Sequence, residues 1–541
     1  MPVEASTEPR GTLARGAATI SIATAVSRLT GFARVVVMAA ALGSTFLANT
    51  YQTANTAPNV VFELIAAGVL TSIFVPTFVE YLVRREHDEG WKAANALTSV
   101  ALVGLIGLSL LIALAAPLIM RVLTIGVNDP DLRASEMALG STFLRLFAPQ
   151  VIFYGVGMIM TGALHAYRKF AMPAIAPIFN NVLVIGVYLL YTTMRGDRPP
   201  TVEGITTAET LVLGIGTTMG VVAMTLCLIP QLRRLGWSFR WRFQLSHPAV
   251  RRAGRVGAWA LGYAGGYQAG LIVVLILANR ISGGVVAYQW AYVFFFVPHA
   301  LFAAPIFHVL FPAMSEDVAK GETESLQTRL RDAMKMLFFI LAPMAAGLFV
   351  AAEPIARVTL QYGLMTENDA ILVGRIIAAF AVGLPTYSAF LVLTRAYYAL
   401  SDPKTPALVN GLAVLVASGT GAVLFFALDP EWAVPGLALG HSIGFLAGTA
   451  ALLFLLNRRR ISLAVRDVYL SVGLSSLGAI LAGAVMAGIA LLLPDQTRLD
   501  ALVSIVVMAI VGAGVYGGVM VLSGSTELQR LVGSLRKKKS E

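Results

Sequence analysis

Ser27-Arg28-Leu29-Thr30-Gly31-Phe32-Ala33-Arg34 places two arginines inside an otherwise apolar run at residues 17–43. An arginine near the middle of a bilayer costs about 2.5 kcal/mol or more, so two of them in one segment indicate a function that requires them. Gly31 lies between the arginines and hydroxyl side chains flank the first one, so this helix is able to bend while neighbouring groups satisfy its backbone. The pattern predicts a broken, cationic first helix beside an anion-binding cavity.

The composition is that of a polytopic membrane protein. Of the 541 residues, 57% are hydrophobic and 13% are charged, whereas an ordinary soluble domain has roughly 25% charged residues. The formal net charge is +11, but a nucleic-acid partner would require basic residues to gather on one solvated face. Here they separate apolar segments at regular intervals, which is typical of membrane-topology signals, so we expect no nucleic-acid partner.

The sequence contains no pattern typical of an enzyme or a metal site. No glycine-rich phosphate loop, His-Glu metal motif or serine elbow occurs in a suitable context. The single cysteine, Cys227, excludes a disulfide within the chain and a cysteine metal cluster. His299 and His308 lie about 180° apart around a helix, so we expect packed or hydrogen-bonded roles for them. We predict no catalytic residue, no metal and no cofactor. The sequence does not identify a coupling ion, and the membrane potential is an alternative energy source.

Fourteen apolar segments are long enough to cross a bilayer, since a helix needs about 20 apolar residues to span a ~30 Å core. The first segment has about 27 residues and continues past two arginines, so it is a retained span rather than a cleavable signal peptide. Pro58, Pro298 and Pro385 predict kinks in the second, eighth and tenth spans. The predicted spans are residues 17–43, 51–82, 93–122, 135–165, 172–194, 208–232, 254–280, 285–314, 333–356, 370–400, 405–427, 433–457, 468–494 and 499–523.

Basic residues orient these spans. They concentrate in the segments that are cytoplasmic if the N-terminus is cytoplasmic, and the predicted outer loops carry few of them, mainly Arg133, Arg195, Arg198 and Arg498. Because this bias persists along the whole chain, it favours an even number of spans with both termini in the cytoplasm.

The segment between the sixth and seventh spans is rich in aromatic and basic residues. Trp237, Phe239, Trp241 and Phe243 alternate with serine, arginine, arginine and glutamine. Aromatic and basic side chains together are typical of a segment that lies on an anionic inner leaflet. A solvated basic loop is the alternative.

Two pairs of similar segments indicate an internal repeat. Residues 74–80 are similar to 310–316, and residues 163–174 are similar to 396–407, at nearly equal offsets. Six spans separate the copies, so the repeat preserves orientation and predicts two six-helix lobes related by an axis along the membrane normal, as in alternating-access transporters. The predicted parts are a cytoplasmic tail (1–16), an N-lobe (17–234), a basic-aromatic linker (235–253), a C-lobe (254–460), a C-terminal helix pair (461–525) and a basic tail (526–541).

Four short motifs occur in order along the chain. They are Ser-Arg-x-x-Gly-x-x-Arg at 27–34, Pro58-Asn59 with Gly68 and Phe74-Val75-Pro76, Arg168-x-Phe170-x-x-Pro173-Ala174-x-Ala176-Pro177, and Ser401-Asp402-Pro403-Lys404-Thr405-Pro406. In these motifs and in its number of spans, the chain resembles the MurJ/MviN family of lipid II flippases, which belongs to the multidrug/oligosaccharidyl-lipid/polysaccharide exporter superfamily. The similarity covers residues 15–525.

The resemblance implies a V-shaped pair of lobes whose cationic cavity accepts the diphosphate of lipid II, an undecaprenyl-linked disaccharide-peptide. The family moves this precursor from the inner to the outer leaflet of the bacterial cytoplasmic membrane for cell-wall synthesis. The implied partners are the lipid-linked precursor, anionic lipids and cell-wall synthesis proteins. Guanidinium groups suit a diphosphate because they bind its oxygens bidentately and remain charged in a low dielectric. The expected substrate-binding residues are Arg28, Arg34, Ser27, Gly31, Asn59, Glu63 and Arg145.

The chain departs from the family's pattern at several polar positions. Val35 and Asn49 stand where relatives carry acidic residues, and Val293 stands where they carry a cavity arginine. Phe62 and Glu63 replace an arginine pair. Residues 256–279 and 405–427 contain no carboxylate, although relatives place part of a sodium site there. The phosphate contacts and the coupling ion of those relatives therefore do not carry over whole.

Alternative roles stay open for the charges within the spans. Arg28 and Arg34 lie about 240° apart along an ideal helix, so they share a face only if the helix bends at Gly31. Either arginine could instead pair with Glu63, the one carboxylate deep in the second span, which could also titrate during transport. Arg145, Arg375 and Arg395 could also line the cavity, although packing against backbone carbonyls or extension toward an interface is the favoured role for each. Arg280 is expected at an outer helix end, as an anchor rather than a ligand.

Two other functions compete with lipid II transport. The chain could export another polyprenyl-linked saccharide or a drug, or it could be a non-transporting scaffold that recruits wall-synthesis proteins through its basic loops. An exporter of cationic drugs needs a negatively charged cavity, whereas the candidate residues here are mostly arginines. The pattern therefore favours an anionic, lipid-linked substrate.

Overall fold

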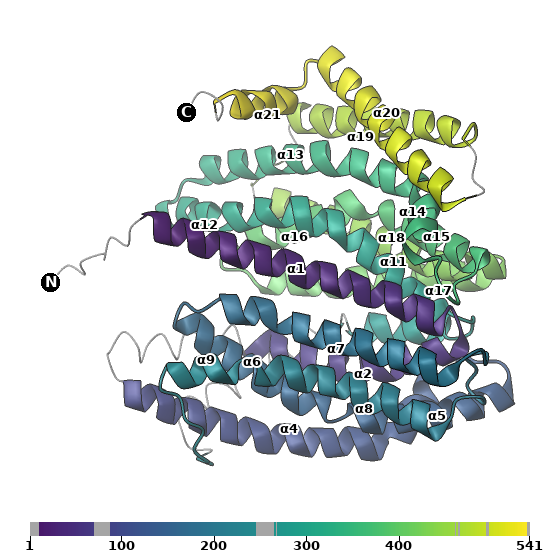
Figure 1. Ribbon diagram of the computed structural model, residues 1–541. Helices are drawn as coiled ribbons and strands as arrows, with labels where there is room; N and C mark the ends of the chain where they lie inside the picture. Colours follow the sequence, from purple (N-terminus) through teal and green to yellow (C-terminus); the bar gives the residue numbers. More distant parts are fainter. Residues whose placement is uncertain are drawn as a thin grey trace. The chain divides into compact units, whose positions relative to one another are not determined.

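The computed structural model describes residues 10–69, 87–244, 265–266, 268–459, 461, 463, 466–493 and 497–537, and the regular elements in these ranges are helices (Figure 1). The chain divides into two compact units, Met1–Gln268 and Ala269–Glu541. This boundary falls inside the predicted seventh span, residues 254–280, and an apolar helix, Gln268–Ala278, begins at it.

In the described ranges, the regular secondary structure of both units is helical. The first unit contains α1 (Arg10–Leu42), α2 (Phe46–Val69), α4 (His87–Leu123), α5 (Pro130–Phe147), α6 (Gln150–Ala166), α7 (Ala171–Arg195), α8 (Thr207–Leu226) and α9 (Ile229–Arg234). The second unit contains α11 (Gly284–Pro298), η2 (His299–Ala303), α12 (Ala304–Lys320), α13 (Thr323–Val350), α14 (Ala352–Leu360), α15 (Glu367–Ala381), α16 (Leu384–Ala399), α17 (Lys404–Ala427), α18 (Pro430–Arg458), α19 (Arg466–Ala490), α20 (Arg498–Leu522) and α21 (Thr526–Lys537).

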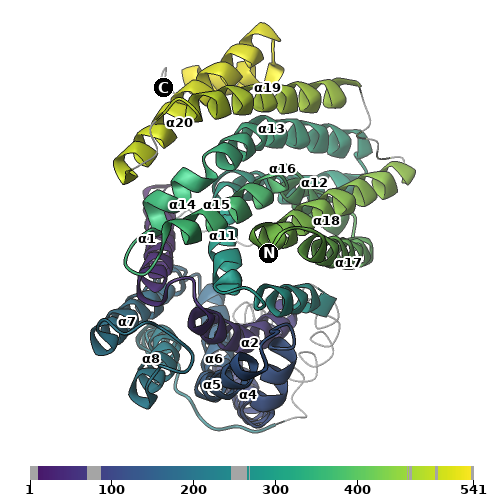
Figure 2. The same cartoon turned by 90° about the vertical axis from the view of Figure 1, so that its right-hand side faces the viewer.

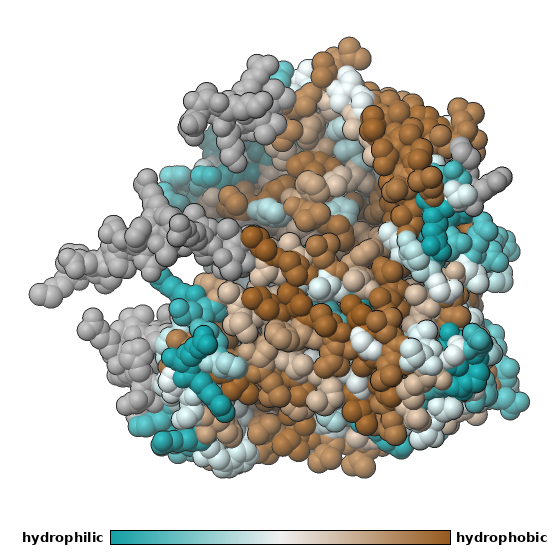
Figure 3. All heavy atoms as spheres, viewed as in Figure 1, coloured by the Kyte–Doolittle hydropathy of each residue, from teal (hydrophilic) through white to brown (hydrophobic). Residues whose placement is uncertain are grey.

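Many of these helices are suited to a bilayer. Within the described ranges, 11 are long and apolar enough to cross a membrane, or 12 if α15 and α16 form one bent span. On the face shown in Figure 3, apolar side chains cover the middle of the helices and polar ones gather toward their ends. The chain is therefore an all-helical, multi-pass membrane protein. Residues 70–82 of the predicted second span, including one copy of the first repeat, and residues 254–264 of the seventh lie outside the described residues.

Two of the three predicted proline kinks coincide with breaks in regular helix. After Pro298 the chain passes from α11 into η2, a π-helical turn. Pro385 lies in the first turn of α16, where α15 and α16 meet at a bend of 46°. Helix α2, in contrast, continues through Pro58. Helix α1 begins at Arg10, inside the segment that the sequence assigned to the cytoplasmic tail.

Within each unit, the helices pack against one another in the same pattern. In the first unit α4 packs on α5 and α6, and α8 packs on α5, α6 and α7. In the second unit α13 packs on α15 and α16, and α18 packs on α15, α16 and α17. The corresponding helices follow the same order along the chain.

The two repeated turns also share their backbone geometry. Arg168, between α6 and α7, has φ 56°, and Ser401, between α16 and α17, has φ 59°. In both turns the N–H of the next residue donates to the carbonyl five residues earlier, at 2.8 and 2.9 Å. This is the hydrogen bond of a Schellman motif, so both helices end by the same mechanism.

Glycines at every fourth position of α18 allow close packing against α17 (Figure 2). A Cβ at Gly440 would lie 2.5 Å from the backbone of Gly421, and a Cβ at Gly444 would lie 2.4 Å from the carbonyl oxygen of Ala413. No larger residue fits these two positions without separating the helices. Small residues at this spacing are a recurring device of membrane helix packing.

The last two long helices pack against α13 and α14 within the second unit. Helix α19 lies on α13, and α20 contacts α13, α14 and α19. The hydroxyl of Tyr516 donates to the carbonyl of Phe339 at 2.7 Å, and Lys335 forms an ion pair with Asp467. At the end of the described chain, Arg530 of α21 pairs with Asp332 of α13 at 2.9 Å.

Candidate functional site

The polar residues of the first span hold α1 against α7. Nδ2 of Asn181, which is buried, donates to the carbonyl oxygen of Ser27 at 3.3 Å and to Oγ1 of Thr30 at 3.1 Å. The Thr30 hydroxyl donates in turn to the Ser27 carbonyl at 2.9 Å. A Cβ on Gly31 would lie 3.5 Å from the same amide nitrogen, an ordinary van der Waals distance, so Gly31 lies on the face of α1 that contacts α7.

The prediction that α1 breaks near Gly31 is wrong. Helix α1 is continuous from Arg10 to Leu42. The hydroxyl of Thr30 and the amide of Asn181 add bonds to the Ser27 carbonyl and do not replace the helical backbone bonds. Gly31 therefore lies in a continuous helix and faces a neighbouring one.

A continuous helix separates the two arginines of the first span. Ser27, Thr30, Gly31 and Arg34 follow the spacing i, i+3, i+4 and i+7, which places them on one face. Arg28 lies about 100° from Ser27 around the axis. Arg28 is exposed and no described side chain pairs with it, whereas Arg34 is half-buried.

Arg34 faces a group of tyrosines inside the first unit. Tyr51, Tyr154 and Tyr188, which belong to α2, α6 and α7, lie within range of its charge. The two arginines therefore have different surroundings and do not form one clasp with a shared orientation.

Tyr51 and Tyr188 belong to a buried polar cluster that the sequence analysis missed. Tyr51, which is fully buried, shares hydrogen bonds with Oγ1 of Thr217 at 2.6 Å and with the hydroxyl of Tyr188 at 3.2 Å. Edge-on contacts at 5.5 Å from Phe143 and Phe147 enclose its ring. Polar residues spaced along apolar spans were the available signal, but nothing in the sequence showed that they meet.

A second set of polar groups continues from this cluster. Nε2 of Gln150, at the start of α6, donates to Oγ1 of Thr218 at 3.3 Å and to Oδ1 of Asn55 at 3.4 Å. The Thr218 hydroxyl donates to the Leu146 carbonyl at 2.8 Å. These bonds join α2, α6 and α8 through side chains, and they stabilise the lobe because unpaired polar groups in a membrane are costly.

The two predicted ligands on α2 form hydrogen bonds with uncharged groups. Nδ2 of Asn59 donates to the carbonyl of Asn55 at 2.9 Å, one turn earlier. Glu63 is exposed and accepts a hydrogen bond from Nε2 of Gln268 at 2.5 Å. The alternative in which Glu63 pairs with an arginine of the first span is wrong for this structure, because its partner is a neutral amide.

Arg145 lies apart from the first-span residues. It is exposed on α5, where Phe143, Leu144 and Phe147 are buried in the lobe, and no described residue forms an ion pair with it. Asn181 binds Ser27 and Thr30, next to Gly31, and no hydrogen bond or ion pair among the described residues joins Arg28 to Asn59, Glu63 or Arg145.

Three arginines of the second unit have aromatic neighbours. Arg375 pairs with Glu431 at 2.6 Å and lies 4.6 Å from the ring centre of Trp432. Arg280 lies 5.2 Å from the ring of Phe426. Arg395 lies 5.8 to 6.0 Å from three aromatic rings of α12 and α16. These contacts favour the packed roles that the sequence predicted for them.

His299 also has a hydrogen-bonded role, as predicted. Its Nδ1 and Oγ of Ser388 are 2.8 Å apart, and both side chains are buried. In the described part of the chain, no three side chains of histidine, cysteine, aspartate or glutamate group closely enough to hold a metal ion.

Sequence comparison identifies relatives over most of the chain. A family model described as lipid II flippase MurJ matches residues 38–512. The Rhizobium tropici protein named "Probable lipid II flippase MurJ" is 28% identical over 469 residues, covering 86% of this chain and 85% of that protein. The "Lipid II flippase MurJ" of Burkholderia cenocepacia is 26% identical over 456 residues, covering 83% of this chain and 84% of that protein.

Solved structures share the fold. "Lipid II flippase MurJ, inward closed conformation" superposes with a TM-score of 0.74 at 21% identity, covering 93% of this chain and 98% of that one. An inward-facing multidrug resistance MATE family transporter of the MOP superfamily gives a TM-score of 0.63 at 14% identity, covering 80% of this chain and 94% of that one. At these identities the likeness concerns the fold alone.

The family match begins four residues after Arg34, so it leaves out the stretch at 27–34 and rests on the remainder of the chain. That remainder includes α2 and all of the helices from α4 to α19. Because the match covers far more than half of the sequence, this chain belongs to the lipid II flippase MurJ family, whose members are transporters rather than enzymes.

Proposed function

We propose that this chain moves lipid II from the inner to the outer leaflet of the bacterial cytoplasmic membrane by alternating access, and so supplies cell-wall synthesis. The family match over residues 38–512 carries this proposal. The shared pattern of helix contacts within the two units supports it, because transporters of this kind are built from repeated lobes that move as bodies.

Arg28 is the proposed ligand of the lipid II diphosphate. Its guanidinium is exposed, and the bonds of Asn181 to Ser27 and Thr30 fix the rotation of α1 that sets its direction. A guanidinium binds phosphate oxygens bidentately and keeps its charge in a low dielectric. Arg34 would add positive potential from within the lobe. Asn59, Glu63 and Arg145 stay in the proposed binding set as half-exposed or exposed groups.

The proposed topology has fourteen spans with both termini in the cytoplasm. Each of the fourteen predicted spans overlaps a described helix, and α2 and Gln268–Ala278 supply the two beyond the twelve long apolar segments. Two six-helix lobes related by a parallel repeat and a C-terminal pair, α19 and α20, follow from this count.

Transport would need an energy source but no cofactor. Glu63, whose partner Gln268 is a neutral amide, is the carboxylate that we assign to energy coupling. The membrane potential or another ion is the alternative coupling. Anionic lipids and cell-wall synthesis proteins are the proposed partners in the membrane.

A reconstituted flipping assay with purified lipid II tests the proposal. Replacing Arg28 by Ala removes a charge-assisted bidentate contact worth about 1.5–3 kcal/mol, so the amount flipped per inserted protein should fall roughly 10- to 100-fold. Arg28→Lys should rescue only part of this loss, because it keeps the charge but not the planar fork.

Arg466→Ala provides a matched control, since Arg466 is an exposed arginine at the start of α19. It should leave transport unchanged. Protein abundance in the membrane should stay near normal in all three variants. A normal flipping ratio in Arg28→Ala would refute the diphosphate contact, and no flipping by the unmodified protein would refute the transport function itself.

A further inference from the structure

The segment after α9 is an extended strap, defined here as residues 235–244 and called the aromatic strap. Two hydrogen bonds attach it to α4. Nδ2 of Asn95 donates to the carbonyl of Ser238 at 3.1 Å, and the backbone N–H of Arg242 donates to Oγ of Ser99 at 2.9 Å. Asn95 and Ser99 are buried, so these are specific attachment points rather than surface contacts. Figure 1 shows the segment leaving α9 and running toward α4.

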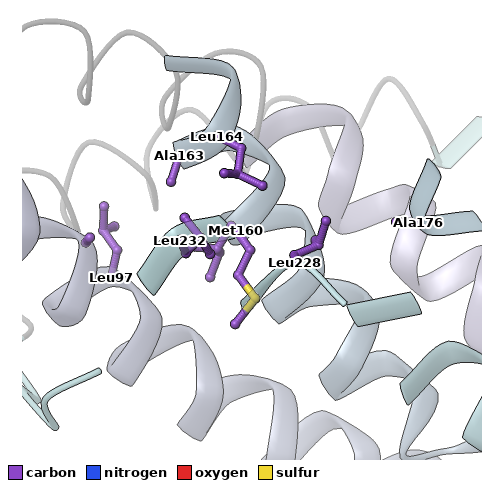
Figure 4. Packing of buried hydrophobic residues seen from close by; sticks show 9 residues of the cluster. Leu97, Met160, Ala163, Leu164, Ala176, Leu228 and Leu232 are labelled. Atoms are coloured by element: carbon purple, nitrogen blue, oxygen red, sulfur yellow. The ribbon is translucent and has the colours of Figure 1, made fainter. Parts of the chain in front are cut away.

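One end of the aromatic strap is anchored in the core of the first unit. The N–H of Trp237 donates to the carbonyl of Leu232 at 3.1 Å. Its indole packs against the buried cluster in Figure 4, which includes Leu97, Met160 and Leu232. The strap is therefore held at its start by packing and along its length by hydrogen bonds.

The remaining aromatic residues of the strap are exposed. Side chains alternate between the two sides of an extended chain, so Trp237, Phe239, Trp241 and Phe243 share one side. The ring of Phe239 lies 6.3 Å from that of Trp237 and 6.4 Å from that of Trp241, which makes a continuous ladder. Phe239, Trp241 and Phe243 are 43%, 57% and 46% exposed. A contiguous exposed aromatic surface of this kind marks an interaction site.

The place where the aromatic strap lies along α4 indicates what covers its exposed aromatic side chains. The exposed apolar face of α4 begins at Val103 and continues through Ile106, Leu110 and Leu114. Val103 lies four residues after Ser99, which is about 6 Å along the helix axis. The strap therefore ends where the lipid-facing part of α4 starts. Tryptophan and tyrosine gather at this level of membrane proteins because their rings are apolar and carry a polar edge.

Arginines lie within and just before the aromatic strap. Arg240 and Arg242 alternate with the aromatic residues, and Arg233 and Arg234 end α9 just before the strap. Long arginine side chains can reach the phosphate level while neighbouring rings lie deeper. Anionic headgroups attract such basic residues by about 1 kcal/mol each near the surface.

We propose that the aromatic strap binds the headgroup region of an anionic leaflet, with the rings of Phe239, Trp241 and Phe243 immersed and the arginines at the lipid phosphates. The strap would tie α4 and α9 to the membrane surface at one end of the first unit. This surface deepens the proposed partnership with anionic lipids, and it does not depend on whether the chain flips lipid II.

Nitroxide scanning in nanodiscs tests the proposal on the full chain. Cys227→Ser removes the single cysteine, and Trp241→Cys and Arg240→Cys then place spin labels at adjacent positions on opposite sides of the strap. In nanodiscs that contain phosphatidylglycerol, the label at 241 should be several-fold more accessible to oxygen than to a water-soluble nickel chelate. The label at 240 should show the reverse preference. Phe243→Cys repeats the test of the immersed side if Trp241→Cys fails to fold.

Nickel accessibility at 241 equal to that at 240 would overturn the proposal and favour a solvated basic loop. Equal immersion in phosphatidylcholine and in phosphatidylglycerol would overturn the assignment to anionic lipid. Flipping activity is not a readout here, so these outcomes are independent of the test of the proposed function.

Discussion

Asn181 provides a direct test of how α1 is fixed. Its amide group donates two hydrogen bonds to the first span, at 3.3 Å to Ser27 and at 3.1 Å to Thr30. Asn181→Ala removes both bonds. It leaves no buried group of α1 unpaired, because the Thr30 hydroxyl still donates to the Ser27 carbonyl at 2.9 Å. The expected loss in the free energy of unfolding is therefore the net contribution of two interhelical hydrogen bonds, without an added desolvation penalty.

An interhelical hydrogen bond in a membrane protein contributes about 0.6 kcal/mol on average and about 1.7 kcal/mol at most. Two such bonds predict a loss of about 1–3 kcal/mol in the free energy of unfolding for Asn181→Ala. Thr30→Val removes one of the two acceptors while keeping the side-chain shape. In the double mutant the two losses should overlap by about 0.6 kcal/mol, the coupling energy of the single Asn181–Thr30 bond.

Steric trapping or thermal unfolding in nanodiscs would measure these free energies. Val182→Ala is the matched control, because Val182 follows Asn181 on α7 but is 57% exposed. It should change the free energy of unfolding by less than about 0.5 kcal/mol. If Asn181→Ala costs no more than this control, the contact does not fix α1 and the explanation for the direction of Arg28 fails.

Two further predictions concern the second unit. Gly444→Ala should destabilise the protein by about 1–3 kcal/mol because its Cβ would lie 2.4 Å from a carbonyl oxygen of α17. Gly419→Ala on α17, with no atom within 4 Å of its Cβ, should be neutral or stabilising by about 0.5–1 kcal/mol; thermal unfolding that ranks the two variants equally would contradict this packing. Partial burial raises the pKa of Asp402, but hydrogen bonds from Thr405 and Arg459 lower it to a net value below the ordinary one. Its stabilisation is therefore fully present above the unfolded pKa of about 3.9 and is lost as the pH falls through the lower folded pKa, so Asp402→Asn should destabilise at pH 7, and its difference from the unmodified protein should shrink as the pH falls below about 3.9.

The fold class was predictable because a bilayer leaves little freedom. Apolar length sets where helices occur, and charge placed between apolar runs sets where they end. The repeat was visible in the turn around Arg168 and Ser401, since both copies end a helix and need a left-handed residue before a proline-containing start. Sequence similarity at that turn therefore reflected a shared backbone requirement.

The candidate site was less predictable because side-chain partners depend on tertiary packing. The sequence shows an asparagine in the fifth span, but it does not show that Asn181 meets Ser27 and Thr30. Likewise, Glu63 has the charge to pair with an arginine, yet the folded chain gives it Gln268. Helical spacing alone could have placed Arg34 on the face of Ser27 and Gly31, and the assumption of a bend at the glycine prevented that inference.

The separate environments of the two arginines favour Arg28 over Arg34 as the substrate ligand. Arg34 is half-buried, with three tyrosines within range of its charge, so a diphosphate has less access to its guanidinium. Arg28 is exposed, so the same contact displaces only the medium around its guanidinium. Because specific binding depends on the difference between the free and bound states, an arginine without competing protein partners gains more from an anionic ligand. The half-buried Arg34 then raises the local potential, and the exposed Arg28 makes the contact.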